Sequence, residues 1–98
     1  MRMRKKKNLG PRMEKCAPVH VRDGFALKGR WREELMPQAR EVRLELGCGK
    51  GRFTVETARR NPEVLFIAIE KVPDALVIAM ERAMAEEVRN VFFVVGDA

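Results

Sequence analysis

The chain has 98 residues, with 20 lysines and arginines against 14 aspartates and glutamates, which gives a formal net charge of +6 and a pI near 9.9. This length allows one small domain or part of a larger one, and a hydrophobic share of 46% is more than a disordered chain contains. No stretch approaches the roughly 18 apolar residues that a membrane span needs, so we expect a soluble protein without a membrane segment.

The positive charge is concentrated at the N-terminus. Residues 1–15 contain seven basic residues and one acid, whereas residues 16–98 contain 13 of each kind. Because turn-forming pairs such as Gly10-Pro11 and Asp23-Gly24 follow, we interpret residues 1–24 as a basic arm and loop. Such an arm commonly binds nucleic acid, and the alternative is a solubilising tail without a partner. No apolar stretch follows the first basic run, which excludes a secretory signal and favours a cytoplasmic protein. The residues expected to bind nucleic acid are Arg2, Arg4, Lys5, Lys6 and Lys7.

Residues 25–98 alternate between strand and helix patterns. A short helix is expected from Trp31 to about Met36. The apolar runs 42–46, 64–69 and 91–95 are typical of strands in a buried parallel sheet, and helices are expected at 52–60 and from Pro73 to about Asn90. This order predicts one half of a doubly wound α/β sheet. Because the first strand would lack a second neighbour, we expect the N-terminal part of a longer protein, with the isolated chain marginally stable and prone to self-pairing.

A glycine-rich turn, Gly47-Cys48-Gly49-Lys50-Gly51, separates the first strand from the helix at 52–60. Glycine allows a tight turn and a close approach of the backbone to a ligand, and the N–H groups at the start of the helix favour an anionic group. A dinucleotide-binding turn would place its third glycine at position 52, where this chain has Arg52, and a P-loop would continue with Ser or Thr after the lysine. Glycines at 47, 49 and 51 have instead the spacing that is typical of S-adenosylmethionine enzymes.

Three acidic residues are expected to meet at the carboxyl edge of the sheet. Glu70 follows the second strand, where a carboxylate can accept hydrogen bonds from both hydroxyls of a ribose. Asp97 follows the third strand and can accept a bond from an adenine amino group, and Glu45, just before the turn, can reach a ligand ammonium or position the loop. Together these acids predict an S-adenosylmethionine site. Taken singly, each has an ordinary explanation as a solvated strand end, an ion pair with Arg43 or Lys50, or a helix cap.

The remaining candidate residues have structural explanations. Cys16 and Cys48 lie 32 positions apart without a Cys-x-x-Cys pair, and His20 is the single histidine. This pattern fits neither a disulfide framework nor a zinc site, so we expect two free thiols and no metal. Met80 and Met84 are interpreted as core residues on one helix face.

Several short motifs in one register resemble the bacterial tRNA (guanine-N7)-methyltransferases. They are Met1-Arg2-Met3-Arg4, Leu27-Lys28-Gly29-Arg30-Trp31, Leu44-Glu45-Leu46-Gly47-Cys48-Gly49-Lys50-Gly51-Arg52-Phe53, Asn61-Pro62, Phe66-Ile67-Ala68-Ile69-Glu70, Asn90-Val91 and Gly96-Asp97-Ala98. The resemblance covers essentially the whole chain. It implies the N-terminal half of a Rossmann-like class I S-adenosylmethionine-dependent methyltransferase fold, truncated after three parallel strands. It also implies that the cofactor is held by Glu45, Glu70 and Asp97 and by the glycines Gly47, Gly49 and Gly51.

The same resemblance implies transfer of a methyl group from S-adenosylmethionine to N7 of a guanine in the variable loop of tRNA. The basic arm would bind tRNA through its phosphates. The family's D-P-W-P-K-K-type motif has no counterpart here, so the catalytic residues are expected in an absent C-terminal half and none is assigned. Two alternatives stay open. One is another S-adenosylmethionine-dependent methyltransferase, acting on RNA or a small molecule, and the other is a non-catalytic RNA-binding relic of the fold.

Overall fold

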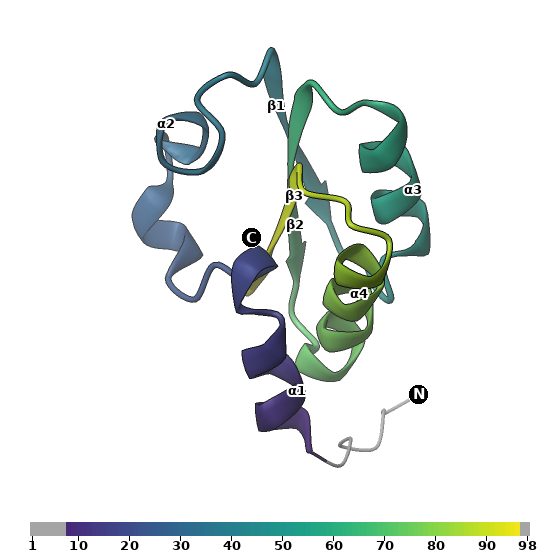
Figure 1. The fold of residues 1–98 in the computed structure, drawn as a ribbon. Helices are drawn as coiled ribbons and strands as arrows, with labels where there is room; N and C mark the ends of the chain where they lie inside the picture. The colour runs from purple at the N-terminus through teal and green to yellow at the C-terminus, as the bar shows by residue number, and fades with distance from the viewer. Residues whose placement is uncertain (1–7, 97–98) are drawn as a thin grey trace.

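A parallel sheet of three strands forms the centre of the computed structural model, which describes residues 8–96 (Figure 1). The strands are β1 (Glu41–Leu46), β2 (Val64–Glu70) and β3 (Val91–Val95), in the spatial order β1-β2-β3. Leu46 lies opposite Ile69, and Glu70 opposite Val95, so the carboxyl ends of the strands meet at one edge. Every residue of β2 is buried, as its uninterrupted apolar sequence predicts. The predicted half of a doubly wound α/β sheet is confirmed.

Two helices cover one face of this sheet. Helices α3 (Arg52–Arg60) and α4 (Pro73–Ala85) lie side by side there (Figure 1). Leu76 and Met80 of α4 are fully buried in one core with Phe66 of β2 and Phe93 of β3. Met84 is 38% exposed, because it lines an open pocket near the end of α4, so the prediction that it belongs to the core is wrong.

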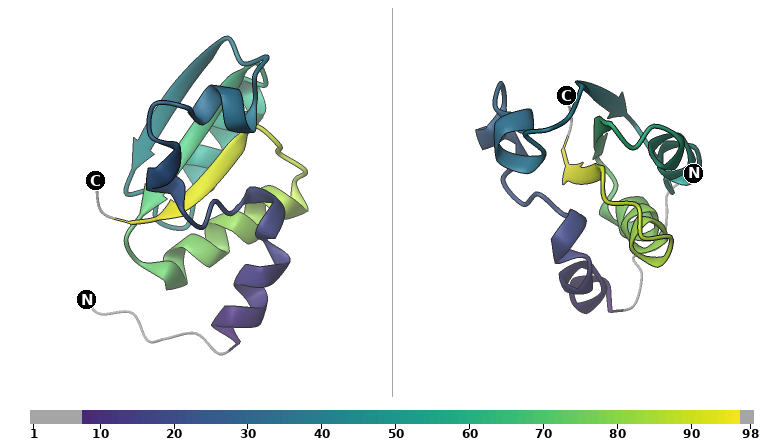
Figure 2. Two further views of the ribbon diagram at one scale, coloured as in Figure 1. Left: turned by 90° about the vertical axis from the view of Figure 1, so that its left-hand side faces the viewer. Right: turned by 45° about the horizontal axis from the view of Figure 1, so that its top comes forward.

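The opposite face of the sheet is only partly covered. Helix α2 (Trp31–Leu35) and the residues around it pack against the side chains of Leu65 and Ile67 in β2. This cover does not extend over the carboxyl half of β1, where Leu44 and Leu46 are 55% and 64% exposed. Figure 2 shows β1 at the rim of the sheet with no described segment along its outer side.

The segment before α2 is more structured than its sequence predicts. It contains α1 (Leu9–Lys15) and two 3-10 helices, η1 (Ala17–Val19) and η2 (Gly24–Leu27). Helix α1 contacts α4 (Figure 2), where the Nε of Arg12 donates to Oε2 of Glu81 at 2.8 Å. The sequence predicts an arm and loop over residues 1–24, but α1 and η1 are helical, and Cys16 and Val19 are buried in the core with residues of α4 and β3. The predicted nucleic-acid-binding residues Arg2, Arg4, Lys5, Lys6 and Lys7 lie outside the described residues.

The two outer edges of the sheet differ. At β3, the N–H of Val21 donates to the carbonyl of Phe93 at 2.9 Å, and His20 forms an isolated parallel bridge with Phe93. The N-terminal segment therefore continues the sheet by one bridge at that edge. Among the described residues, β1 pairs with β2 alone.

Asn90 has a structural role that differs from the expected one. Helix α4 ends at Ala85, and Glu87 adopts a left-handed conformation with φ of 55°, so the chain leaves the helix before Asn90 is reached. The side chain of Asn90 is buried, and its Nδ2 lies 2.8 to 2.9 Å from the carbonyl oxygens of Ala58, Asn61 and Val64. Asn90 thus connects the end of α3 and the start of β2 to the start of β3. Within residues 8–96, no helix is long and apolar enough to cross a membrane.

Candidate cofactor-binding site

The turn between β1 and α3 lies at the carboxyl edge of the sheet and depends on the conformation of its three glycines. Gly47, Gly49 and Gly51 have φ values of 69°, 57° and 76°. Residues other than glycine adopt this left-handed backbone region only at a cost in free energy. The N–H of Gly47 donates to the carbonyl of Ile69 at 2.8 Å, which extends the pairing of β1 with β2 into the turn. The N–H of Gly51 donates to the carbonyl of Cys48 at 3.0 Å and closes the turn before α3 begins.

The three glycines differ in what surrounds them. A Cβ atom added to Gly51 would collide with the Cβ of Ala79 and would lie 2.9 Å from its Cα, so this glycine allows α3 to start directly against α4. A Cβ atom at Gly47 or Gly49 would meet nothing within 4 Å. The Cα atoms of the first two glycines therefore face open space, where a ligand can approach the turn closely.

Glu70 connects this turn to the start of α4. Its Oε1 accepts a hydrogen bond from the N–H of Gly49, and its Oε2 accepts one from the N–H of Val72, both at 2.9 Å. Only 8% of the residue is exposed. The two backbone donors hold its carboxylate in place at the end of β2. Each carboxylate oxygen has a further lone pair, so the group can still accept hydrogen bonds from a bound diol.

Glu45 lies in β1, just before the turn. It is opposite Ala68 in the register of β1 with β2, and it is half-buried. The neighbouring Arg43 forms its ion pair with Glu41, at 3.0 Å, and not with Glu45.

The pKa of the Cys48 thiol shows the electrostatic environment of the cofactor corner, by which we mean the glycine turn with Glu45 and Glu70. Burial, which is the largest cause, and the negative charges of Glu70 and Glu45 together raise this pKa to about 11, against the lowering effect of a hydrogen bond to backbone. Both carboxylates therefore act on one point inside the turn. A region with two carboxylates and one neutral thiol favours a cationic ligand group, such as a sulfonium or an ammonium.

The third predicted acid cannot be placed with the other two. The N–H of Gly96 donates to the backbone carbonyl of Glu70 at 3.1 Å, so β3 ends at the same edge as β2. Asp97 itself lies outside the described residues. The structure thus brings Glu45, Glu70 and the glycine turn together, and the participation of Asp97 stays a prediction.

Sequence reasoning missed two participants in this corner. The N–H of Val72 binds Glu70, and the half-buried thiol of Cys48 has its pKa raised in part by the charges of both carboxylates. A backbone donor leaves no trace in the residue pattern, whereas the position of Cys48 inside the glycine turn was a usable signal. Both cysteines are free, as predicted. Residues 8–96 contain no group of three histidine, cysteine or acidic residues that could hold a metal ion.

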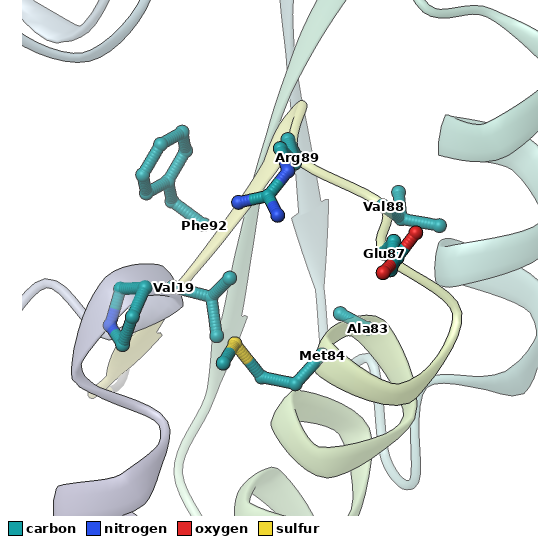
Figure 3. Close-up of a pocket in the computed structure, with 8 residues that line it drawn as sticks. Val19, Ala83, Met84, Glu87, Val88, Arg89 and Phe92 are labelled. Atoms are coloured by element: carbon teal, nitrogen blue, oxygen red, sulfur yellow. The ribbon is translucent and has the colours of Figure 1, made fainter.

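A separate pocket of about 200 Å³ lies away from this turn, between η1, the end of α4 and the start of β3 (Figure 3). Its wall is mainly apolar, with Val19, Met84 and Phe92 around it and Glu87 and Arg89 at its side. It adjoins the amino end of β3, whereas ligands of open parallel sheets bind outside the carboxyl ends of the strands. The glycine turn is therefore the stronger candidate for a cofactor site.

Comparisons with known proteins identify the relatives of this chain. Residues 39–98, which include the whole turn and all three strands, match a protein family described as "Putative methyltransferase". The chain is 34% identical over 98 residues to a tRNA (guanine-N(7)-)-methyltransferase of Listeria innocua, covering all of this chain and 45% of that protein. It is 38% identical over 91 residues to the protein of the same name in Clostridium acetobutylicum, covering 93% of this chain and 42% of that protein.

A solved structure also shares the fold. A 30S ribosomal methyltransferase from an uncultured bacterium superposes with a TM-score of 0.61 at 27% identity, over 71% of this chain and 34% of that one. The chain thus spans less than half the length of the curated relatives that it matches.

Proposed function

The chain belongs to this methyltransferase family, and on that premise we propose that its glycine turn binds S-adenosylmethionine. We further propose that the protein transfers the methyl group to N7 of a guanine in the variable loop of tRNA. The likeness to tRNA (guanine-N(7)-)-methyltransferases over the whole chain supports the choice of substrate. A cytoplasmic location accords with a tRNA substrate and stays part of the proposal.

The observation that carries the cofactor proposal is the carboxylate of Glu70, fixed by the N–H groups of Gly49 and Val72 at the mouth of the turn. A fixed carboxylate beside open glycine backbone fits a ribose diol. The second carboxylate, Glu45, fits the positive charge of the methionine part. We include Asp97 as an acceptor for the adenine amino group on sequence grounds alone.

Methyl transfer to guanine N7 requires little acid–base catalysis by the protein. When bound, S-adenosylmethionine supplies a methyl group on a sulfonium, and that carbon–sulfur bond breaks as the bond to the guanine N7 lone pair forms. N7 carries no proton, so no general base is required. The residues of this chain therefore contribute by holding the cofactor in one orientation. This alignment of the methyl group with guanine N7 increases the rate. No residue among those described is assigned to guanine or to the transfer itself.

The cofactor proposal is tested by calorimetric titration of S-adenosylhomocysteine into the chain and into its Glu70→Gln variant. We expect an affinity loss of about 100-fold, because an ionised acceptor of two hydrogen bonds becomes a neutral group with one acceptor. Glu86→Gln is the matched control, since it makes the same charge change at the exposed opposite end of α4. Equal affinities of the Glu70→Gln variant and the parent chain would refute this site. If the parent chain has no affinity for S-adenosylhomocysteine, the result would favour the non-catalytic RNA-binding relic.

The substrate proposal needs a separate experiment. Unmodified bulk tRNA is incubated with the protein encoded by the complete gene and labelled S-adenosylmethionine, and 7-methylguanosine is then sought in the tRNA and mapped. We expect the label at one guanine of the variable loop. In a parallel incubation with 30S ribosomal subunits, labelling of ribosomal RNA while the tRNA stays unlabelled would instead support the solved 30S ribosomal methyltransferase as the closer functional relative.

A further inference from the structure

The pocket at the amino end of β3 combines apolar walls with one arginine (Figure 3). It has a volume of about 200 Å³ and lies between η1, the end of α4 and the start of β3. Its wall includes four apolar side chains, which are Val19, Ala83, Met84 and Phe92. We propose that this pocket binds a small monocarboxylate, with the apolar body of the ligand against these side chains and its carboxylate on the guanidinium of Arg89.

The pocket lies on the side of the sheet that faces away from β1. The N–H of Val21 donates to the carbonyl of Phe93 at 2.9 Å, so the N-terminal segment already occupies the outer edge of β3. Further strands of a longer relative can therefore join the sheet beside β1, but not between η1 and β3. The carboxyl end of β3 at Val95 is also remote, because five extended residues span roughly 15 Å. All walls of the pocket thus come from elements that the structure describes.

Arg89 is the group that would bind an anion in this pocket. It lies in the loop between α4 and β3 and is exposed. Two arginines of α3, Arg59 and Arg60, are held by ion pairs with Glu56 at 2.8 and 3.1 Å. Arg89, by contrast, forms no hydrogen bond or ion pair with any residue of the range 8–96, so its five N–H donors are available to a ligand. Figure 3 shows its guanidinium extending toward the side of the pocket that Phe92 forms.

The charges around the pocket favour a ligand with a single negative charge. A guanidinium binds a carboxylate through two parallel hydrogen bonds, which a single free arginine can supply. The carboxylate of Glu87 lies at the side of the pocket, beside Val88 (Figure 3). Its negative charge opposes a second negative charge on the ligand, such as that of a phosphate monoester or a dicarboxylate. A monocarboxylate is therefore the anion that this pocket fits best.

The volume of the pocket determines the size of the apolar body. A cavity of about 150 Å³ lined by aliphatic and aromatic side chains holds a benzene molecule. A pocket of about 200 Å³ therefore accommodates a six-membered ring together with a carboxylate. Met84 is 38% exposed in the free pocket, and its unbranched side chain can change rotamer to cover the ring. Benzoate matches the pocket in size, charge and apolar surface, and it is the probe for the test.

Titration with benzoate, followed by NMR of the backbone amides, tests the proposal in the 98-residue chain and in the protein encoded by the complete gene. We expect saturable shifts at Val19, Val88 and Phe92 with a Kd of about 1 mM, which is typical of so small a ligand. The amides of Gly47 and Gly49 in the cofactor corner should not shift. Benzyl alcohol, which has the same ring without the charge, should bind about tenfold more weakly. Acetyl-glycyl-phenylalanine presents the same chemistry at a chain end, and tighter binding of this peptide would identify a peptide C-terminus as the source of the carboxylate.

Two variants test the role of the charges. Arg89→Gln should weaken benzoate binding by about tenfold and leave the affinity for benzyl alcohol unchanged, whereas Glu87→Gln should strengthen benzoate binding. Arg30→Gln removes an exposed arginine at the start of α2 and is the matched control. Because Arg89 and Glu87 are both exposed, neither variant should unfold the chain. Equal benzoate affinities of Arg89→Gln and the parent, or binding to the 98-residue chain that is absent from the complete protein, would overturn the proposal.

Discussion

Two glycines of the turn differ in their effect on stability: Gly51 packs against α4, whereas Gly49 faces open space that a ligand can occupy. Gly51 combines a left-handed φ of 76° with the close packing of its Cα against Ala79, whereas Gly49 has the left-handed φ alone. Both glycines lie in a region where a side chain costs about 1–2 kcal/mol, but only Gly51 would add a steric collision, which costs a further ~1–3 kcal/mol. The turn is thus fixed at its α3 end by packing and left open at its β1 end.

We expect Gly51→Ala to lower the free energy of unfolding by about 3 kcal/mol, against about 1 kcal/mol for Gly49→Ala. Urea unfolding followed by circular dichroism measures both values. Gly49→Ala serves as the control for the backbone contribution. If the two variants lose the same stability, then the contact between Gly51 and Ala79 does not limit the packing of α3 on α4.

Cys48 gives a reactivity prediction with a defined pH dependence. Its pKa is raised from 9.0 to about 11, so the folded chain holds the reactive thiolate at about one hundredth of the fraction found in a free cysteine near neutral pH. Alkylation by iodoacetamide should therefore be about 100-fold slower than in the urea-unfolded chain, and its rate should rise with pH until the pKa of about 11 is reached. Peptide mass spectrometry distinguishes Cys48 from the buried Cys16.

The same measurement tests the role of Glu70. Its negative charge is one of the causes that raise the pKa of Cys48, so Glu70→Gln should speed alkylation of Cys48. Glu86→Gln, at the far end of α4, should leave the rate unchanged. A rate near that of a free cysteine in the folded parent chain would show that the thiol is neither buried nor beside the carboxylates.

At the scale of elements, α1 is attached to the fold by few interactions. Arg12 pairs with Glu81 of α4, and this pair raises the pKa of the Arg12 guanidinium above its ordinary value. None of the residues of α1 is buried. A helix of this length does not form on its own in water, so it depends on its contact with α4.

We expect Arg12→Ala to release α1 while the sheet stays folded. Limited trypsin digestion should then cut after Lys15 faster than in the parent chain, and thermal unfolding of the remaining fold should change little. Arg22→Ala removes another exposed arginine of the N-terminal segment and is the control. An unchanged rate of cleavage after Lys15 would mean that the other contacts of α1 are sufficient to hold it.

The sequence predicts best those elements in which a single physical effect, such as complete burial or a required left-handed backbone, determines the residue pattern. β2 is buried on both faces, so its apolar run alone identifies it, and the glycine spacing identifies the turn. Helix α1 was not predictable, because it contains Gly10 and Pro11 and is stabilised by α4, a partner far away in the sequence. Asn90 was misread for the same reason, since its hydrogen bonds reach three carbonyls in α3, the following loop and β2.

For the candidate site, the sequence predicted that Glu45 and Glu70 lie at one edge of the sheet, but not which groups they contact. The order of strands brings Glu45 and Glu70 to one edge, which follows from any parallel sheet. That Glu70 binds both the glycine turn and the start of α4 depends on the distance and angle between those elements, which no local pattern encodes.

At the scale of the whole molecule, nearly all of the net charge belongs to the first seven residues. The chain has a net charge of +6, whereas residues 8–98 contain 15 basic and 14 acidic residues. Around the glycine turn, the carboxylates of Glu45 and Glu70 act on Cys48, and three exposed basic residues, Lys50, Arg52 and Lys71, lie nearby. A polyanion such as tRNA would therefore be attracted most strongly to the N-terminal residues, where the net charge is concentrated.

We expect residues 1–7 to supply most of the salt dependence of tRNA binding. If all five of their basic side chains contact phosphates, replacing Arg2, Arg4, Lys5, Lys6 and Lys7 with glutamine should reduce the slope of log K against log salt by up to about 4. Binding is measured with unmodified bulk tRNA between about 50 and 200 mM salt. Titration of the same variant with S-adenosylhomocysteine is the control and should give the parent affinity, because these residues lie outside the cofactor corner in sequence. An unchanged slope would assign the phosphate contacts to basic residues after position 7, of which Lys50, Arg52 and Lys71 are the exposed ones beside the turn.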